Sequence, residues 1–211
     1  MKVLALLGAG NKRRNTATML QSAFDGAMSV EGAEGELICL YDLNFRGCYG
    51  CHSCKLKDEK RLGRCATRDD LTSVLEKAVD ADVLLIGSPI YYGNITGETR
   101  SFLERYLFPS MTYNVDRVLM YPKRTKVGWV LTMNARAESY TDYADSLVAT
   151  TSRMIGESDY VMACQTQQFE DFSKYEASRF DEAAVKQRHI EQFPLDCEAA
   201  FTMGKRLAEG V

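Results

Sequence analysis

The chain has 211 residues, of which 45% are hydrophobic and 26% are charged, with a net charge of −3. This composition indicates a folded globular protein and excludes the disordered and collagen-like classes. Slight acidity without a long basic run argues against nucleic acid or a membrane surface as the main partner. No apolar stretch reaches the roughly 18 residues of a membrane span and no export signal is recognisable, so we expect a cytoplasmic protein.

Short apolar runs and amphipathic stretches alternate along the chain. Strands are predicted where apolar runs end in glycine or polar residues, at 3–7, 37–40, 83–87, 126–133 and 160–164. Helices are predicted at about 15–32, 70–78, 97–107, 140–155 and 181–209, the last broken or kinked at Pro194. Ser88 and Pro89 are expected to turn the chain out of the third strand.

Five strand and helix units in this order predict an α/β fold, because parallel strands need long right-handed crossovers. We expect a single domain over 1–211, built on a doubly wound five-stranded parallel sheet of order 2-1-3-4-5 with helices on both faces. A cysteine-rich insertion at about 46–66 interrupts the pattern. Two further stretches fit it badly, 108–124 and the aromatic-containing 166–180; they are either lids or oligomer arms, or they cover the sheet edges.

In such sheets, ligands bind beyond the carboxyl ends of the strands, where the strand order reverses. The first loop selected by this rule lacks the Gly-Lys-Ser/Thr element of a Walker loop and the third glycine of a dinucleotide loop. Its glycines lead into a helix start with cations nearby, which is typical of a phosphate site. Its candidate ligands are Gly8, Ala9, Gly10, Asn11, Arg13, Arg14, Asn15 and Thr16. The alternative is an ordinary N-capped helix with solvated basic residues.

Two more loops meet the same edge. The second offers aromatic rings, glycine and an amide to a flat ligand, through Pro89, Ile90, Tyr91, Tyr92, Gly93 and Asn94. A role for both tyrosines in lining the core is the alternative. The third loop adds Thr132, Met133 and Asn134. A phosphate subsite beside a flat slot bounded by amides suits a mononucleotide cofactor such as FMN.

These pieces resemble the NADPH-dependent FMN reductase and iron-sulfur flavoprotein family, which has a flavodoxin-like fold. The resemblance rests on the first loop, on the run Gly87 to Gly93, on the cysteine block with Asp69 and Asp70, and on the tail Lys174 to Asp181. It implies bound FMN, NAD(P)H as co-substrate and a homodimer or homotetramer. Relatives commonly carry Gly-Ser-Pro-Arg where this chain has Gly8 to Asn11, so Arg13 or Arg14 has to supply the positive charge.

The cysteine block is a separate question. Iron-sulfur members of the family hold a cluster with C-x2-C-x2-C and a fourth cysteine after a short gap. Here Cys48, Cys51 and Cys54 have that spacing, and Cys65 follows after a longer gap. A [4Fe–4S] cluster, zinc and free thiols all stay open for these four residues.

We therefore expect a flavin oxidoreductase that takes a hydride from NAD(P)H onto FMN and passes electrons to a quinone, a flavin, another small molecule or a protein acceptor. Because the flavin carries the chemistry, no protein residue is expected to act as a catalytic acid or base. Three rivals are a flavodoxin-type electron carrier, a nicotinamide-binding dehydrogenase suggested by Gly8, Gly10 and Asp42, and a flavin-binding regulatory module.

Overall fold

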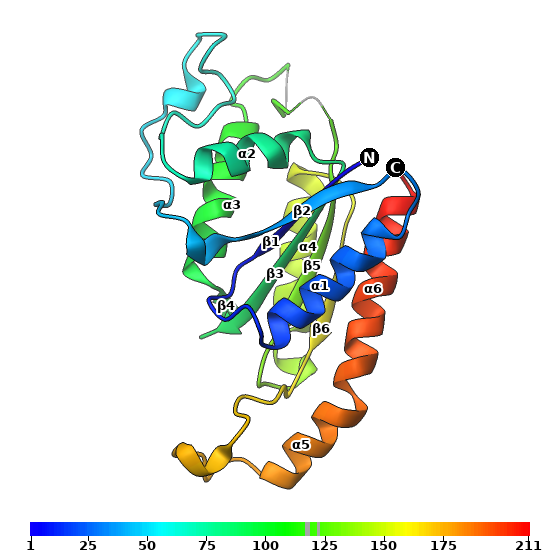
Figure 1. Ribbon diagram of the computed structural model, residues 1–211. Coiled ribbons are helices and arrows are strands. Elements are labelled where there is room, and N and C mark those ends of the chain that lie inside the picture. Colours follow the sequence, from blue (N-terminus) through cyan, green and yellow to red (C-terminus); the bar gives the residue numbers. More distant parts are fainter. Residues whose placement is uncertain (117–118, 122) are drawn as a thin grey trace.

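The computed structural model describes residues 1–116, 119–121 and 123–211, and over them the chain forms one parallel sheet with helices on both faces (Figure 1). The neighbouring strands are β2-β1-β3-β5-β6. Their bounds are β1 (Lys2–Leu7), β2 (Glu34–Cys39), β3 (Val83–Tyr91), β5 (Lys126–Thr132) and β6 (Ser158–Ala163). Apart from a small additional strand, this order is the predicted one, and the α/β doubly wound, flavodoxin-like fold is confirmed.

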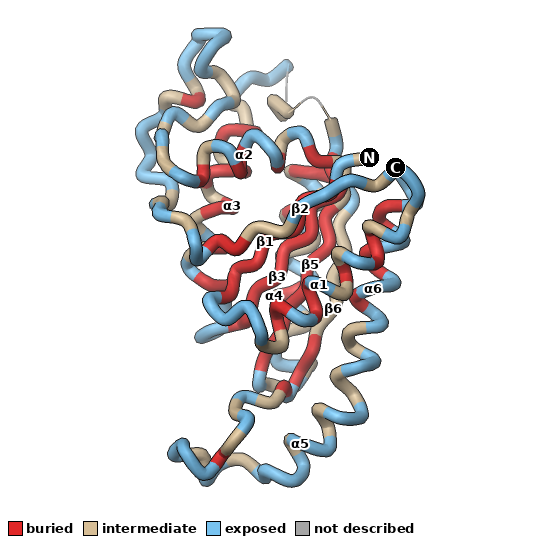
Figure 2. The backbone as a smooth tube through the Cα atoms, in the orientation of Figure 1, coloured by how far each residue is buried: buried red, intermediate tan, exposed pale blue. Residues whose placement is uncertain are grey.

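Two hydrophobic cores lie on the two faces of the sheet. Successive residues of a strand point to opposite faces, so Leu4 and Leu6 of β1 enter one core while Val3, Ala5 and Leu7 enter the other. The first core is closed by α2 (Leu71–Asp80), α3 (Gly97–Ser110) and α4 (Thr141–Met154). The second is closed by α1 (Asn15–Met28) and α6 (Phe193–Glu209). Figure 2 shows the buried strands running between these layers.

The tail is two helices, α5 (Glu182–Glu191) and α6, and the predicted break at Pro194 is confirmed. Proline lacks an N–H and is tolerated in the first turn of a helix, which is where Pro194 lies. α6 packs closely on α1 through glycines. A Cβ added at Gly204 would lie 1.9 Å from the Ala23 carbonyl oxygen, and one at Gly26 would lie 2.0 Å from the Phe201 oxygen.

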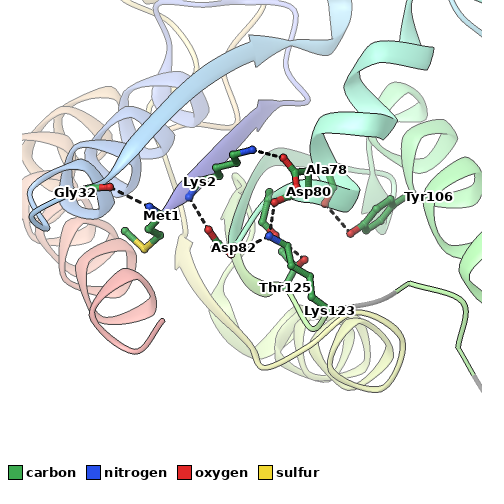
Figure 3. Close-up of polar contacts among 10 residues, drawn as sticks. Met1, Lys2, Gly32, Ala78, Asp80, Asp82, Tyr106, Lys123 and Thr125 are labelled. Carbon is green, nitrogen blue, oxygen red and sulfur yellow. Dashed lines mark hydrogen bonds and ion pairs between the residues drawn. The ribbon is translucent and has the colours of Figure 1, made fainter.

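Polar contacts tie the amino-terminal edge of the sheet together (Figure 3). The Lys2 backbone N–H donates to Asp82 Oδ2 at 2.7 Å, and Lys123 Nζ donates to Asp82 Oδ1 at 2.8 Å. On the neighbouring helices, the Tyr106 hydroxyl donates to the Ala78 carbonyl at 3.0 Å. Asp82 thus joins β1 to the segment that precedes β5, at the edge opposite the predicted ligand loops.

The third strand is longer than predicted. β3 continues through Ser88 and Pro89 to Tyr91, with Pro89 in register with Thr132 of β5, so the predicted exit at Ser88 and Pro89 is wrong. A two-residue strand, β4 (Asn94–Ile95), then pairs antiparallel with the end of β3. Short 3-10 turns complete the structure at Leu40–Asp42, Ser53–Lys55, Ala137–Ser139 and Phe172–Lys174.

The aromatic segment 166–180 and α5 project away from the sheet (Figure 1). Its rings pack on one another, with the Phe169 and Tyr175 centroids 4.2 Å apart and Phe172 and Phe180 edge-on. The start of the segment contacts the loops at the carboxyl edge of the sheet through Thr166, Gln167 and Glu170. Both interpretations of the segment therefore stay predictions. The other irregular stretch, 108–124, includes residues 117, 118 and 122, which lie outside the described residues. None of the described helices is long and apolar enough to cross a membrane.

Candidate functional site

The register of the sheet brings the three predicted loops to one edge. Leu7 at the end of β1 is paired with Gly87 of β3, and Gly87 is paired with Val130 of β5. The chain segments that follow β1 and β5 therefore emerge on either side of β3, close to its final hairpin. This is the strand-order switch point at which doubly wound sheets bind ligands.

Hydrogen bonds join the loops directly. The Gly8 N–H donates to the Gly87 carbonyl at 2.7 Å, and the Thr96 hydroxyl donates to the Gly8 carbonyl at 2.8 Å. The buried hydroxyls of Thr16 and Thr132 lie 2.6 Å apart. Glycine is required at position 8, because an added Cβ would lie 1.8 Å from the Thr99 Oγ1. Hydrogen bonds therefore hold the loops of this edge together, and the side chains of Thr16 and Thr132 are buried among them.

The start of α1 is open to an anion. Its N-cap, Arg14, makes no side-chain hydrogen bond to the first turn, so among the described residues no side chain of the cap position occupies the N–H groups of that turn. Asn15, which also lies at this start, donates its Nδ2 to the Gln167 carbonyl at 2.9 Å. Free N–H groups at the beginning of a 14-residue helix, together with the helix dipole, favour a negatively charged group.

The three cations of this loop differ in their pairing. Lys12 Nζ lies 2.5 Å from Asp42, and Arg14 lies 3.0 Å from Glu170. Arg13 is exposed and has no ion-pair partner among the described residues. Its backbone N–H donates to Asn11 Oδ1 at 3.0 Å, which shapes the exposed turn. Arg13 is therefore the loop cation whose charge is not matched by a carboxylate.

The hairpin between β3 and β4 presents two tyrosines to solvent. Tyr91 is 60% exposed and Tyr92 108%, so the interpretation that they line the core is wrong. Tyr92 has φ +49° and Gly93 φ +86°, and such a left-handed conformation is uncommon for a tyrosine. Pro89 and Ile90 are buried, so neither of these predicted ligands presents an exposed side chain.

Tyr143 of α4 anchors this hairpin and was not predicted. Its hydroxyl donates to Asn94 Oδ1 at 2.7 Å and accepts the Ile95 N–H at 3.1 Å. Burial raises the pKa of Tyr143, so this hydroxyl stays protonated at neutral pH. Its distance along the chain from the hairpin explains why no local pattern identified it.

Other residues at this edge were also missed. The Tyr41 ring lies against the loop, 3.3 Å from where a Gly10 Cβ would be, and burial and Glu98 raise its pKa to about 12. The loop after β6 joins the site as well, since the Gln165 N–H donates to the Ala135 carbonyl at 3.0 Å. This loop also follows the carboxyl end of a strand, so the rule that ligands bind beyond those ends could have identified it. Of the third predicted loop, Thr132 and Met133 are buried, and Asn134 is exposed.

The four clustered cysteines lie at a second place, in the insertion beside α3. Cys54 is 6% exposed, Cys65 is half-buried, and Cys48 and Cys51 are exposed. All four line one small cavity of about 20 Å³, together with His52 and Arg105 among others. That volume accommodates about one water molecule. Within the described ranges, no three Cys, His, Asp or Glu side chains form a ready metal-holding group.

The donor chemistry of this cavity nonetheless suits a cluster. Four thiols from one insertion face a common space, and burial raises the pKa of the Cys54 thiol. Arg105 Nε, at the same cavity, is buried with no hydrogen-bond partner in the described part of the chain. Sulfur ligands with an unused cationic donor beside them match what an anionic iron-sulfur group needs. The insertion has to open around such a group.

Known proteins resemble this chain in sequence. An iron-sulfur flavoprotein of Archaeoglobus fulgidus is 40% identical over 105 residues, covering 50% of this chain and 48% of that protein. An iron-sulfur flavoprotein of Methanocaldococcus jannaschii is 32% identical over 105 residues, covering 50% of this chain and 51% of that protein. The matched part of the chain thus spans about half the length of these relatives.

Solved structures share the fold. The NAD(P)H:quinone oxidoreductase from Methanothermobacter marburgensis has a TM-score of 0.69 at 15% identity, covering 98% of this chain and 96% of that one. A flavodoxin from the domain Archaea has a TM-score of 0.53 at 13% identity, covering 100% and 98%. The model of a family described as NADPH-dependent FMN reductase matches residues 1–156. The chain therefore belongs to the NADPH-dependent FMN reductase family.

Proposed function

We propose that this chain is an FMN-dependent NAD(P)H oxidoreductase whose flavin lies at the carboxyl edge of the sheet. Bound FMN would supply hydride acceptance from NAD(P)H and two-electron transfer to an acceptor, for which a quinone or a flavin is the first candidate. The observation that carries the proposal is the start of α1, which has no side-chain cap. Beside it lie Arg13, which has no ion-pair partner among the described residues, and the exposed Tyr91 hairpin on the neighbouring strand.

We assign a task to each part of this edge of the sheet. The N–H groups at the start of α1 and the Arg13 guanidinium hold the phosphate, because they are the free donors and the unmatched charge there. Tyr91 and Tyr92 present rings, and the Gly93 backbone leaves room for a flat ligand to approach. Asn134 supplies an exposed amide at the far side.

Several residues act by holding this geometry. Thr96 links the Gly8 carbonyl to the hairpin, since its own N–H donates to Ser88 Oγ at 3.1 Å. Tyr143 binds Asn94 and the Ile95 N–H, and these two hydrogen bonds hold the hairpin in shape. No side chain at this edge has to move a proton for hydride transfer, which leaves binding and orientation as the protein's contribution.

A second part of the proposal concerns the cysteine insertion. We assign Cys48, Cys51, Cys54 and Cys65 as ligands of a [4Fe–4S] cluster, which would let electrons leave singly to a one-electron partner. The support is their common cavity, its free cationic donor and the names of the relatives, which are iron-sulfur flavoproteins. Iron, acid-labile sulfide and zinc are measured on anaerobically purified protein. Zinc without iron and sulfide, or no metal at all, contradicts the cluster.

The flavin site is tested by comparing FMN with riboflavin, which lacks the phosphate. Arg13→Ala is expected to weaken FMN binding about tenfold, the equivalent of about 1.4 kcal/mol, and to leave riboflavin binding unchanged. Lys12→Ala is the matched control, because Lys12 is already paired with Asp42 at 2.5 Å. Equal losses for FMN and riboflavin in Arg13→Ala, or equal FMN losses in both variants, would contradict the placement of the phosphate.

Turnover distinguishes an enzyme from a carrier. We expect FMN-loaded protein to oxidise NADH or NADPH under anaerobic conditions when a quinone or free flavin is supplied. A protein that cannot be reconstituted with FMN refutes the proposal. FMN binding without nicotinamide oxidation identifies a flavodoxin-type carrier or a regulatory module.

A further inference from the structure

One arginine holds both ends of the cysteine insertion. Arg105 lies in the middle of α3 and is 1% exposed. Its Nη1 donates to the Arg46 carbonyl at 3.1 Å and to Asp69 Oδ2 at 2.5 Å, and its Nη2 donates to the Thr67 carbonyl at 3.1 Å. Arg46 precedes the first clustered cysteine and Thr67 follows the last. The guanidinium therefore fixes the base of the whole insertion on α3.

The same side chain retains a donor that this role does not use. Arg105 Nε is buried and has no hydrogen-bond partner among residues 1–116, 119–121 and 123–211. A buried charged donor without a partner loses its solvation and gains no hydrogen bond in return, which is unfavourable. Arg105 lines the cavity that the four cysteines line, and it lies beside Cys65. An acceptor in that cavity, rather than in the surrounding fold, would satisfy it.

Asp69 and Cys65 stabilise the positive charge of Arg105. Burial lowers the pKa of the guanidinium, but the Asp69 carboxylate and the nearby Cys65 thiol more than offset this and raise it overall. Lys55 adds a second cation, because its Nζ donates to the Phe108 and Met111 carbonyls. It lies 4.4 Å from the centroid of Phe108, a residue of the cavity wall. The surroundings of the cavity thus suit an anionic guest.

We propose that Arg105 is the positioning residue of this cavity, holding both ends of the insertion on α3 and donating its Nε–H to a ligand sulfur of the cluster. This rests on the cluster proposed above. A hydrogen bond to sulfur and a buried positive charge both favour the more negative, reduced state of such a centre. Arg105 therefore raises the reduction potential of the cluster, and Asp69, which partly neutralises it, lowers that potential.

The test compares three variants in the FMN-loaded full-length protein. Arg105→Met removes the charge and the hydrogen-bond donors. Arg105→Lys keeps the charge but loses the guanidinium that binds Arg46, Asp69 and Thr67 together. Asp69→Asn removes the neutralising carboxylate. Arg153→Lys is the control, because Arg153 is exposed in the last turn of α4. Iron and sulfide content is measured first, followed by the midpoint potential in a redox titration monitored by electron paramagnetic resonance.

We expect Arg105→Met to lower the midpoint potential by about 59 mV or more, which corresponds to a tenfold change for a one-electron couple. Asp69→Asn is expected to shift the potential in the opposite direction, and Arg153→Lys to leave it unchanged. Potential shifts of opposite sign in Arg105→Met and Asp69→Asn would identify charge as the cause. If either substitution merely loosened the insertion, both would shift the potential in the same direction. Arg105→Lys is expected to shift the midpoint potential less than Arg105→Met does. It is also expected to lose iron more readily than the wild-type protein.

The failures are distinguishable. Wild-type protein without iron and sulfide overturns the cluster and this inference with it, and leaves the FMN site untouched. Wild-type protein that holds the cluster, with unchanged potentials in Asp69→Asn and Arg105→Lys, overturns the role of Arg105 alone. These two milder variants decide the matter even if Arg105→Met does not fold. Shifts of the same sign in Asp69→Asn and in the Arg105 variants also overturn it.

Discussion

Replacing Gly8 with alanine places one methyl group at the point where the loops of the flavin site meet. The added Cβ would lie 1.8 Å from Thr99 Oγ1, 3.0 Å from the Gly87 carbonyl oxygen and 3.2 Å from Thr99 Cβ. Thr99 has to move, and its 2.8 Å hydrogen bond with Thr96 is then broken. Thr96 in turn holds the Gly8 carbonyl.

The magnitude follows from two contributions. Overpacking a well-filled site costs about 1–3 kcal/mol, and a lost buried hydrogen bond adds about 1 kcal/mol. We expect Gly8→Ala to lower the free energy of unfolding by about 3 kcal/mol and the Tm by about 6–12 °C for a chain of this size. FMN affinity is expected to fall at least tenfold, because the first turn of α1 shifts with the loop.

Urea unfolding followed by the fluorescence of buried Trp129 measures the stability, and a flavin titration measures the affinity. Gly97→Ala is the matched control, because a Cβ there meets nothing within 4 Å. Adding Thr99→Ala to Gly8→Ala removes the 1.8 Å clash and should restore part of the loss. A Tm within about 1 °C of wild type for Gly8→Ala, or purely additive effects in the double variant, would refute this reasoning.

Three further substitutions test other parts of the structure. Tyr143→Phe removes the hydroxyl that binds Asn94 and should cost about 1–2 kcal/mol and weaken FMN binding, measured by unfolding and titration. Burial raises the pKa of Asp82, but Lys123 more than offsets this and lowers it overall, so Asp82→Asn should cost about 1–2 kcal/mol at neutral pH. That difference should vanish as the pH falls through the lowered pKa in acid unfolding. Gly204→Ala should separate α6 from α1 and lower the Tm by several degrees.

Each of these has its own control. Tyr140→Phe affects a half-buried tyrosine near Tyr143 and should be neutral; a comparable loss would mean that the hydroxyl of Tyr143 is not the cause. For Asp82, a difference that grows toward low pH would show that its pKa is raised in the folded state. For Gly204, an unchanged Tm would show that the helices separate without cost.

The order of the sheet could be predicted because its signals are strong. Five apolar runs with long amphipathic crossovers leave few topologies, and the strand-end rule then brings the three loops together. The loops meet as expected, while the cofactor contacts of their individual residues stay a prediction. The hairpin was missed because its turn uses Tyr92 with positive φ, where asparagine or aspartate is usual, and because β4 has two residues.

Long-range contacts could not be predicted. Tyr143 reaches Asn94 across 49 residues, and Arg105 reaches Arg46 across 59. In a helix sequence, arginine at position 105 looks like a solvated surface residue, because arginine is almost never fully buried without a partner. Its partners are backbone carbonyls of an insertion without periodicity, so no spacing rule identifies them.

One helix belongs to both sites. Thr99, in the first turn of α3, contacts the Gly8 network, and Arg105 follows six residues later beside the cysteine cavity. At 1.5 Å per residue this is a rise of about 9 Å along a single rigid rod. An inserted or deleted residue between them would rotate one site against the other by about 100°. Chimeras that exchange the insertion between relatives should therefore carry α3 with it, and place their junctions before Arg46 and after Ser110.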